Sequence, residues 1–445
     1  MQKNNIFETM KMPKLILQMA IPSIIAMLVI VLYNMADTFF IGQTNNSAML
    51  AAVSVATPVF MILVTLGSLI GIGGSACISQ ALGRKDYDQV KKISSFCAWI
   101  AIIVGTIYAI VVNIYLEPIC SMLGASPETL DYAKEYVSII GLSAPVTIFS
   151  GVNANLIRSE GSSKESMFGN IIGTFLNIIL DPILILSMNM GVKGAAIATL
   201  ISNAVASLYY CSYYFWKKDT KISISPKYFS INPTIIKMVV LIGLPAAITN
   251  LLGSVSIVFV NKILYSYGDA SIAAMGVSIK LLLLTSLLQV GLSNGVLPIM
   301  SYCRGAKLKE RFIGCLKWSV IYSVSLGSVL GLFMFIFRYQ LLSAFTTDTQ
   351  IYQLAETMTG ILLMSAPVIG LYTISIASLQ SMNNPRSALF VSILRQGLYF
   401  IPLLYILQPM LGEMGIILAQ PISDFLSVIT ALILVRYILK KKEMW

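Results

Sequence analysis

Asn177-Ile178-Ile179-Leu180-Asp181-Pro182 lies inside an otherwise apolar run that extends from Phe168 to Leu186. The run has about the length that a helix needs to cross the hydrocarbon core of a bilayer, roughly 20 residues. A helix places Asn177 and Asp181 on one face, one turn apart. A carboxylate in hydrocarbon costs about 2.5–3.5 kcal/mol, and Pro182 frees a backbone carbonyl about four residues earlier. The stretch therefore predicts a spanning helix with a site for a small cation. The alternative is an Asp that only ties two helices together.

The composition of the whole chain is typical of a polytopic membrane protein. Its 445 residues are 57% hydrophobic and 11% charged, with a mean hydropathy of +0.83. A soluble core of this size cannot hide so much apolar sequence behind so few charges. Histidine is absent, which excludes imidazole relays, His-ligated metals and Ser-His or Cys-His catalysis. The six cysteines form no close-spaced pair, so we expect buried thiols at Cys77, Cys97, Cys120, Cys211, Cys303 and Cys315.

Twelve apolar segments are long enough to span a bilayer. Six precede and six follow the polar stretch 216–236, which we interpret as a linker between an N-lobe (1–215) and a C-lobe (237–445). The fold class that follows is all-α: a polytopic membrane protein with twelve transmembrane helices in two six-helix bundles. The expected spans are 15–41, 49–80, 92–116, 132–157, 165–187, 192–215, 237–264, 272–301, 313–337, 354–380, 387–408 and 414–437.

Basic residues are distributed unequally between the loops. When loops are assigned alternately to the two sides of the membrane, 24 of the 30 Lys and Arg residues fall on one side. By the positive-inside rule, this side is cytoplasmic. We therefore expect both termini and the 216–236 linker in the cytoplasm, a topology that explains the net charge of +11 without nucleic acid. The remaining basic residues are Lys134, Lys193 and Arg338 on the other side, and Lys262, Lys280 and Arg395 within spans.

The two halves of the chain repeat at a shift of about 222 residues. Because this shift covers six crossings, an even number, the repeats point the same way. A pseudo-two-fold axis along the membrane normal should relate them, with a substrate cavity between the bundles. The matching pairs are Ile21-Pro22 with Leu244-Pro245, Ala51–Val55 with Ala273–Val277, Gly83-Arg84 with Arg304-Gly305, and Ser143-Ala144-Pro145 with Ser365-Ala366-Pro367.

Apart from Glu135, Glu165 and Glu356 in the first turns of their spans, three acidic residues lie within the expected spans: Asp37 in the first, Asp181 in the fifth and Asp424 in the twelfth. The first and fifth spans run outward, which places Asp37 and Asp181 in the outer half of the membrane. Thr199 lies about two turns past the start of the inward-running sixth span, again in the outer half. With Asn177, these side chains form a set of hard oxygen ligands that suits Na⁺ or protons, whereas a transition metal prefers imidazole or thiolate.

Several stretches spread over nearly the whole chain resemble the multidrug and toxic compound extrusion (MATE) family, and its MepA-type bacterial branch most. They are Asp37-Thr38-Phe39-Phe40-Ile41-Gly42, Gly73-Gly74 through Gly83-Arg84, Arg158-Ser159-Glu160-Gly161, Asn177-Ile178-Ile179-Leu180-Asp181-Pro182, Gly194-Ala195-Ala196-Ile197-Ala198-Thr199 and Phe345-Thr346-Thr347-Asp348. The resemblance implies an exporter of bulky organic cations in the bacterial inner membrane, driven by Na⁺ or H⁺ entry. It also implies a cation site, with Na⁺ as the metal, at Asp37, Asn177, Asp181 and Thr199.

One feature departs from the family pattern. Some branches carry acids on the seventh and tenth helices, but the corresponding spans here hold Lys262 and no central acid. Coupling through the C-lobe is therefore disfavoured. Arg395 and Asp424, in neighbouring spans, are expected to pair as a structural tie, because charges inside a membrane commonly pair with one another. Lys262 and Lys280 either snorkel toward the interface, bond carbonyls or gate the substrate.

Aromatic residues within the spans are candidates for binding flat organic cations through cation–π contacts. More often, aromatics in spans face lipid or the protein core. The candidates for substrate binding are Tyr33, Phe149, Phe175, Tyr372 and Tyr399.

A secondary multidrug antiporter is the function that these observations favour. We expect a monomer in the lipid bilayer that exports small organic cations by alternating access, with Na⁺ or H⁺ as coupling ion and no cofactor. A lipid-linked oligosaccharide flippase of similar fold is the second hypothesis, but it should show a cationic cavity for pyrophosphate, whereas the N-lobe spans concentrate acids. No nucleophile–base set or nucleotide loop indicates an enzyme.

Overall fold

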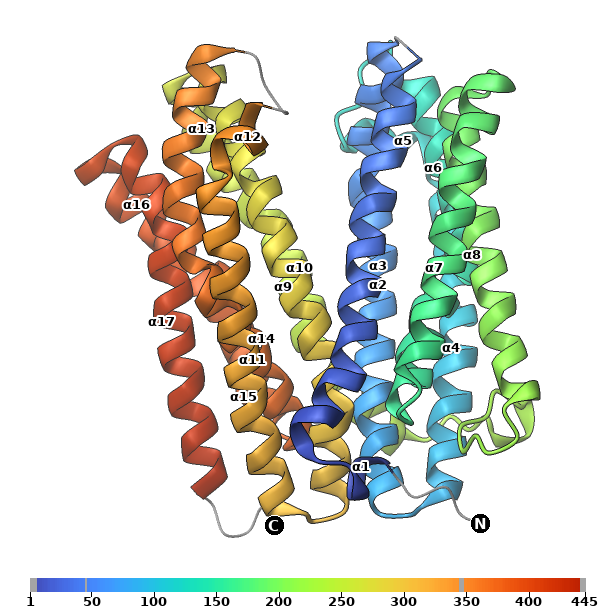
Figure 1. Cartoon of the computed structure of the whole chain (residues 1–445). Coiled ribbons are helices and arrows are strands. Elements are labelled where there is room, and N and C mark those ends of the chain that lie inside the picture. Colours follow the sequence, from blue (N-terminus) through green and yellow to red (C-terminus); the bar gives the residue numbers. More distant parts are fainter. Residues whose placement is uncertain (1–5, 45, 344–347, 441–445) are drawn as a thin grey trace. The chain divides into compact units, whose positions relative to one another are not determined.

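The computed structural model describes residues 6–44, 46–343 and 348–440, which form helices joined by short connections, with no strand among them (Figure 1). Twelve helical segments are long and apolar enough to cross a membrane, which confirms the twelve predicted spans. Of the motif at 345–348, the residues Phe345, Thr346 and Thr347 lie outside the described part of the chain.

The chain packs as two compact units, Ile25–Gly243 and Met1–Ile24 together with Leu244–Trp445. We call them the N-unit and the C-unit. The division follows packing rather than chain order, because the starts of the first and seventh spans each pack with the opposite half of the sequence. The lobes expected at 1–215 and 237–445, with the linker 216–236, stay a prediction.

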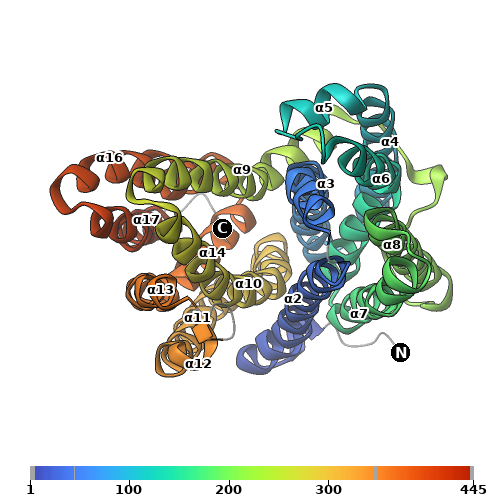
Figure 2. The same ribbon diagram turned by 90° about the horizontal axis from the view of Figure 1, so that it is seen from above.

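The N-unit is organised around α6, which packs against α3, α4, α7 and α8 (Figure 2). The short helix α5 also lies against α6. The fifth span continues without a break from α7 into a π-helix, η1. Its elements, besides the end of α2 (Met12–Gly42), are α3 (Ser47–Gly83), α4 (Tyr87–Ile114), α5 (Leu116–Met122), α6 (Leu130–Ser159), α7 (Ser163–Asp181), η1 (Pro182–Ser187), α8 (Gly191–Trp216) and η2 (Pro226–Tyr228).

The C-unit is organised around α14, which packs against α10, α11 and α17. Since α6 and α14 belong to the fourth and tenth spans, corresponding spans of the two repeats occupy the centres of their units. The start of α2 and all but the start of α9 (Pro233–Leu264) belong to the C-unit. Its other elements are α1 (Ile6–Thr9), η3 (Tyr265–Tyr267), α10 (Asp269–Gly305), α11 (Lys309–Ile336), α12 (Arg338–Ser343), α13 (Thr349–Leu362), η4 (Leu363–Ser365), α14 (Ala366–Ser381), α15 (Pro385–Ile393), η5 (Leu394–Tyr399), α16 (Phe400–Leu411) and α17 (Glu413–Lys440).

Two glycines on the second and eighth spans bring backbones into direct contact within each unit. A Cβ atom on Gly73 of α3 would lie 2.0 Å from the carbonyl oxygen of Val239 on α9. A Cβ atom on Gly295 of α10 would lie 2.6 Å from the Cα atom of Ala20 on α2. Gly73 and Gly295 stand at corresponding positions of the repeat. In both units, therefore, the absence of a side chain lets the starting segment of α9 or α2 pack directly on the next span.

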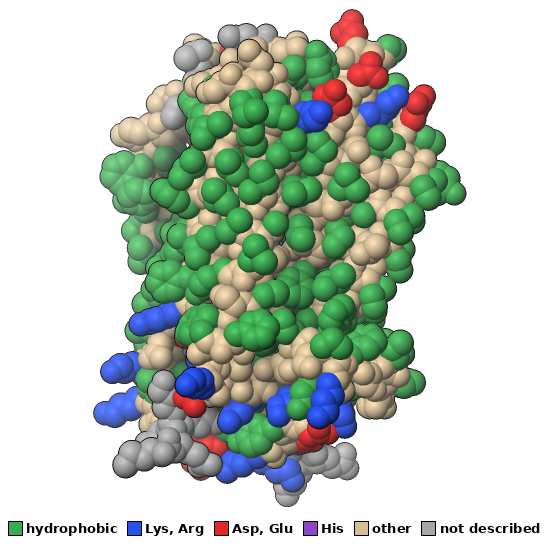
Figure 3. Space-filling model, turned by 90° about the vertical axis from the view of Figure 1, so that its right-hand side faces the viewer, with side chains coloured by type: hydrophobic (Ala, Val, Ile, Leu, Met, Phe, Trp, Pro, Cys, Tyr) green, Lys and Arg blue, Asp and Glu red, His purple; other side chains and the backbone are tan. Residues whose placement is uncertain are grey.

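The surface agrees with a protein embedded in lipid. On the face shown in Figure 3, hydrophobic side chains cover the middle, and Lys and Arg gather at one end. Many large apolar side chains are exposed on the spans, for example Ile107 and Ile110 on α4 and Leu208 on α8. In water such a surface would be unfavourable, whereas in a bilayer it contacts acyl chains.

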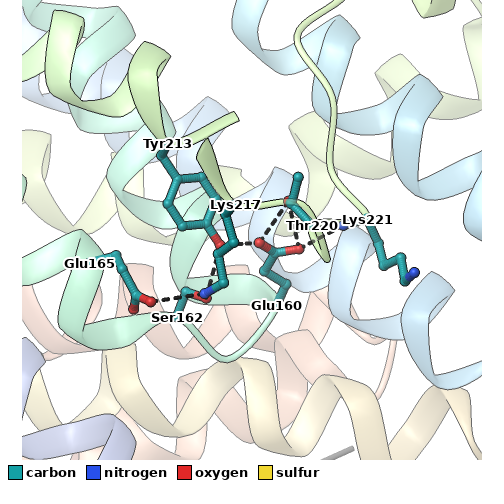
Figure 4. A network of polar contacts seen from close by, with 7 residues as sticks. All are labelled: Glu160, Ser162, Glu165, Tyr213, Lys217, Thr220 and Lys221. Carbon is teal, nitrogen blue, oxygen red and sulfur yellow. Dashed lines mark hydrogen bonds and ion pairs between the residues drawn. The ribbon is translucent and has the colours of Figure 1, made fainter. Parts of the chain in front are cut away.

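Glu160, at the turn between α6 and α7, holds the start of the linker (Figure 4). Its carboxylate accepts hydrogen bonds from Tyr213 Oη, from Thr220 Oγ1 at 2.8 and 3.0 Å, and from the backbone N–H of Lys221 at 3.0 Å. Lys217 forms an ion pair with Glu165 at 2.8 Å. The resemblance motif that contains Glu160 therefore closes the turn onto the chain segment after the sixth span.

Further along, side chains of α4 hold the linker by hydrogen bonds to the backbone of the linker. Ser94 Oγ donates to the carbonyl oxygen of Ser223 at 3.0 Å, and Ser95 Oγ donates to that of Ser225 at 2.8 Å. Trp99 Nε1 donates to the carbonyl oxygen of Ile224 at 3.0 Å. The linker is not helical here, so its carbonyl groups have no helical hydrogen bonds and instead accept from side chains of α4. This part of the linker is therefore a fixed component of the N-unit.

Candidate cation-coupling site

The structure brings together the residues that the sequence predicted for a cation site. Asp37 lies on α2, Asn177 and Asp181 lie on α7, and Thr199 lies on α8. All four are buried, with exposed fractions of 8, 1, 0 and 1%, respectively. All belong to the N-unit, so the site is internal to one packing unit.

Asn177 links the fifth span to the sixth. In the amide orientation that satisfies both of its polar atoms, Asn177 Nδ2 donates to Asp181 Oδ2 at 3.1 Å. Its Oδ1 accepts from the backbone N–H of Thr199 at 3.3 Å. Asn203, one turn further along α8, donates to the carbonyl oxygen of Thr199 at 2.9 Å. Because the Asn177 amide bonds both the Asp181 carboxylate and the backbone of α8, it holds the carboxylate at a fixed place beside α8.

Two carboxylate oxygens in the site have no hydrogen-bond partner among the described residues: Asp37 Oδ1 and Asp181 Oδ1. The two carboxylates also lie within electrostatic range of each other. Buried acceptors of this kind are costly unless a cation or proton satisfies them. The oxygens of Asp37, Asn177, Asp181 and Thr199 are of the hard type that Na⁺ and protons prefer, and their role as a cation site stays a prediction.

Pro182 changes the helix directly after Asp181. The structure widens from the α-helix into the π-helix η1, and the N–H of Met188 donates to the carbonyl oxygen of Ile183 at 2.9 Å. The wider turn accommodates a proline, which lacks a donor and would clash in a regular helix. Single π-helical turns are frequent at functional sites, and this one ends the helix that carries Asn177 and Asp181.

Tyr33 belongs to the same cluster. Its hydroxyl lies 3.1 Å from Thr199 Oγ1, and it stands one turn before Asp37 on α2. Tyr136 of α6, which the sequence reasoning missed, is also buried and lies within electrostatic range of Asp37, Asp181 and Tyr33. No local signal marks Tyr136, because only the packing of α6 against its neighbours brings it there.

The other aromatic candidates have different surroundings. Phe149 of α6 is buried, whereas Phe175 of α7 is 64% exposed. Tyr399 Oη lies 3.1 Å from Thr430 Oγ1 in the C-unit. Tyr372 is buried, and its ring lies under the guanidinium of Arg395, 4.9 Å from centroid to Cζ. Their roles in substrate binding stay predictions.

The expected pairing of Arg395 and Asp424 is confirmed. Arg395 Nε donates to Asp424 Oδ1 at 2.7 Å, and the two side chains are 12 and 1% exposed. Gln420 Nε2 donates to the same oxygen at 2.8 Å. This pair lies in the C-unit, on the eleventh and twelfth spans.

Twelve helical segments of the described residues can cross a membrane, and one packing unit encloses a buried polar cluster; together these features are typical of a membrane transport protein. The MatE family matches residues 22–183 and 245–406, and the chain belongs to this family. The double match confirms the internal repeat, and it covers the site residues Asp37, Asn177 and Asp181. The chain is therefore a transporter and not an enzyme.

Curated relatives cover almost the whole chain. The chain is 33% identical over 436 residues to the multidrug export protein MepA of Staphylococcus saprophyticus, covering 98% of this chain and 96% of the relative. It is also 33% identical over 437 residues to MepA of Staphylococcus aureus, with the same coverage. The resemblance to the MATE family and its MepA-type branch is thereby confirmed.

Solved structures share the fold. An outward-facing multidrug resistance MATE family transporter of the MOP superfamily matches with a TM-score of 0.93 at 24% identity, covering 98% of both chains. A MOP superfamily transporter of Pyrococcus furiosus, described as having a binding pocket of reversed polarity, matches with a TM-score of 0.92 at 23% identity and 99% coverage of both. The predicted all-α, twelve-span fold class is confirmed.

Proposed function

We propose that this protein is a secondary antiporter that exports small organic cations in exchange for Na⁺ or H⁺ at Asp37, Asn177, Asp181 and Thr199. The relatives named as multidrug export proteins support the export function. One observation carries the coupling site: Asp37 Oδ1 and Asp181 Oδ1 are both buried and have no hydrogen-bond partner within the described part of the chain. Two such acceptors in one unit need a cation or proton from outside the chain.

The ion would act by neutralising the two acids. With the site empty, the carboxylates repel each other across α2 and α7. An ion or proton bound between them draws α2, α7 and α8 together, so the two arrangements of the N-unit differ in energy. Alternating access requires a bistable element of this kind, with binding of ion and substrate favouring different states.

We also propose an oligomeric state, a membrane and an orientation for the protein. We place it as a monomer in the bacterial cytoplasmic membrane, with both termini and the linker on the cytoplasmic side. The unequal distribution of Lys and Arg supports this topology. The basic end of the face in Figure 3 would then lie in the cytoplasm.

A lipid-linked oligosaccharide flippase remains the second hypothesis. Such a protein would use basic side chains inside its bundle to bind a pyrophosphate. In the C-unit the guanidinium of Arg395 is already paired with Asp424, and the N-unit site is acidic. Both observations favour the export of cations over the flipping of an anionic lipid.

Counterflow in proteoliposomes tests the proposal. A fluorescent organic cation is followed while Na⁺ and pH gradients are imposed separately, which also identifies the coupling ion. Asp181→Asn keeps the shape of the side chain but cannot hold a net charge, so it should abolish coupled transport. The loss of a charged partner, about 1.5–3 kcal/mol, corresponds to a roughly tenfold to hundredfold weaker ion affinity.

Asp424→Asn is the matched control, because it removes an intramembrane acid from the other unit. Coupled transport per folded molecule should persist in this variant, while the stranded Arg395 lowers its stability. Normal transport by Asp181→Asn under both gradients, together with a loss in Asp424→Asn, would move the coupling site to the C-unit and refute the proposal. Stimulated transport of a pyrophosphate lipid in place of the cation would support the flippase.

A further inference from the structure

The C-unit contains a second buried polar cluster, built from the spans that correspond to those of the cation site. In the N-unit, the first, fourth, fifth and sixth spans contribute Asp37, Tyr136, Asp181 and Thr199. In the C-unit, the seventh, tenth, eleventh and twelfth spans contribute Ser256, Tyr372, Arg395 and Asp424. Ser256 Oγ of α9 donates to the carbonyl oxygen of Gln396 at 3.0 Å and ties the seventh span to the eleventh.

The centre of this cluster is the carboxylate of Asp424, which is 1% exposed. Its Oδ1 accepts from both Arg395 Nε and Gln420 Nε2, at 2.7 and 2.8 Å. Its Oδ2 is buried and has no partner among the described residues, and the same holds for Ser427 Oγ, about one turn further along α17. Asp424 lies near the middle of its span, where an unneutralised charge is most costly.

Arg395 satisfies this carboxylate from a neighbouring span. Its guanidinium forms the ion pair on one side and lies over the ring of Tyr372 on the other, 4.9 Å from Cζ to the centroid. Ser423 Oγ donates to the carbonyl oxygen of Arg395 at 2.5 Å and fixes the backbone of η5 beside α17. Aromatic ring, carboxylate and backbone bond therefore hold one cationic group at one place.

We propose that Arg395 is a tethered cation, which occupies at Asp424 the position that a free cation would take in a second coupling site. Without the guanidinium, the cluster would offer Oδ1 and the unpartnered Oδ2 of Asp424, with Ser427 Oγ about one turn away along α17. These are hard oxygen ligands suited to a small monovalent cation. Because Arg395 belongs to the chain, no dissolved ion displaces it under ordinary conditions.

The consequence for transport rests on the proposed function. If ions couple at the N-unit site, the tethered cation keeps the C-unit from binding a second ion, and each cycle carries ions through one site only. The central parts of the seventh and tenth spans contain no acidic residue, which agrees with ion binding in the N-unit alone. A purely structural ion pair makes a different prediction, since its stranded carboxylate would be neutralised by a proton and would show no preference among dissolved cations.

Binding of cations to a variant without the guanidinium tests the proposal. The purified full-length protein carries Asp181→Asn in every sample, which removes one of the two carboxylates of the N-unit site. Thermal unfolding of Asp181→Asn/Arg395→Ala is measured with increasing guanidinium chloride or NaCl in the low millimolar range, with choline chloride added to constant ionic strength. Choline serves as the comparison cation, because its quaternary nitrogen is bulky and has no N–H group to donate to the carboxylate.

We expect a saturable rise in Tm with guanidinium, and a smaller one with Na⁺, of about 3–5 °C when the ligand greatly exceeds its Kd. Asp181→Asn alone should show no such rise, because Arg395 fills the position. Asp181→Asn/Arg395→Ala/Asp424→Asn should also show none. Arg395→Gln replaces Arg395→Ala if the alanine variant does not fold, since glutamine fills more of the space.

Two results would overturn the proposal: equal Tm responses to guanidinium, Na⁺ and choline, or a response that persists after Asp424→Asn. Neither depends on transport, so this test can fail while the antiporter function stands. Conversely, if Asp181→Asn does not affect counterflow, the proposed coupling site is refuted, while the predicted binding of a cation at Asp424 is not.

Discussion

Asn177 and Asp181 contact each other side chain to side chain, one turn apart on α7, with 3.1 Å between Nδ2 and Oδ2. The same amide accepts from the backbone N–H of Thr199. Asn177 therefore fixes one oxygen of the carboxylate, and the other, Oδ1, has no partner among the residues that the structure describes. Asn177 thus positions Asp181, and in the proposed site its amide would also present an oxygen to the ion.

Replacement of Asn177 should weaken ion binding less than replacement of the acids. Asn177→Ala removes a neutral hydrogen-bonding group, a loss of about 1 kcal/mol, so the half-saturating ion concentration should rise roughly fivefold. Counterflow at varied Na⁺ or pH measures this constant. Thr199→Ala should behave similarly. A complete loss of coupling in Asn177→Ala with a normal fold would mean that the amide is indispensable, contrary to this estimate.

Tyr33 permits a test that separates ion binding from substrate binding. Tyr33→Phe removes only the hydroxyl that meets Thr199 Oγ1, so the ion affinity should fall about fivefold while the substrate affinity changes less than twofold. Both constants come from counterflow, with ion and substrate varied in turn. Phe175→Leu, at an exposed position on α7, is the control. If only the substrate affinity changes, Tyr33 contacts the substrate, as predicted from the sequence, and does not contribute to ion binding.

A double-mutant cycle measures the coupling of Arg395 and Asp424. Arg395→Ala strands a buried carboxylate, and breaking such a pair costs about 3–5 kcal/mol. Removing both charges in Arg395→Ala/Asp424→Asn should recover part of the thermal stability, because no unpaired charge remains. Additive losses of stability across the cycle would contradict a direct interaction between the two side chains.

Much of the fold could be predicted because hydropathy is a local property. The twelve spans follow from apolar runs, and Asn177 and Asp181 follow from a four-residue spacing that any helix converts into one face. The pairing of Arg395 with Asp424 was predictable for a similar reason, since buried charges in a membrane have few alternatives.

Other features depend on packing between distant segments and could not be predicted from the sequence. Tyr136 joins the site only because α6 lies at the centre of the N-unit. The exchange of the α2 and α9 starting segments between units depends on close contacts at Gly73 and Gly295. In the sequence, Ser94 and Ser95 are ordinary polar residues at the start of a span. Only the folded structure brings the linker carbonyls to their hydroxyls.

The contacts of Glu160 predict how firmly the linker is held. Glu160→Ala removes every bond to Thr220 and Lys221 shown in Figure 4, so the linker should open more often. A loss of about 1.5 kcal/mol in local stability corresponds to a roughly tenfold faster tryptic cleavage at the linker lysines, as long as opening is rapid. Glu165→Ala, which loses only a partly exposed ion pair, should change the rate less than twofold. Equal rates in both variants would show that Glu160 does not hold the linker.

Labelling of single cysteines tests the topology. Ser230 in the linker and Glu128 in the connection between α5 and α6 are both exposed, and the predicted topology places them on opposite sides of the membrane. The native background is low, since five of the six cysteines are buried and Cys211 is partly exposed. In intact cells, an impermeant maleimide should therefore label Glu128→Cys at once and Ser230→Cys only after the membrane is permeabilised. Labelling of Ser230→Cys from outside would invert the topology and place the basic loops outside the cell, against the direction that the positive-inside rule requires.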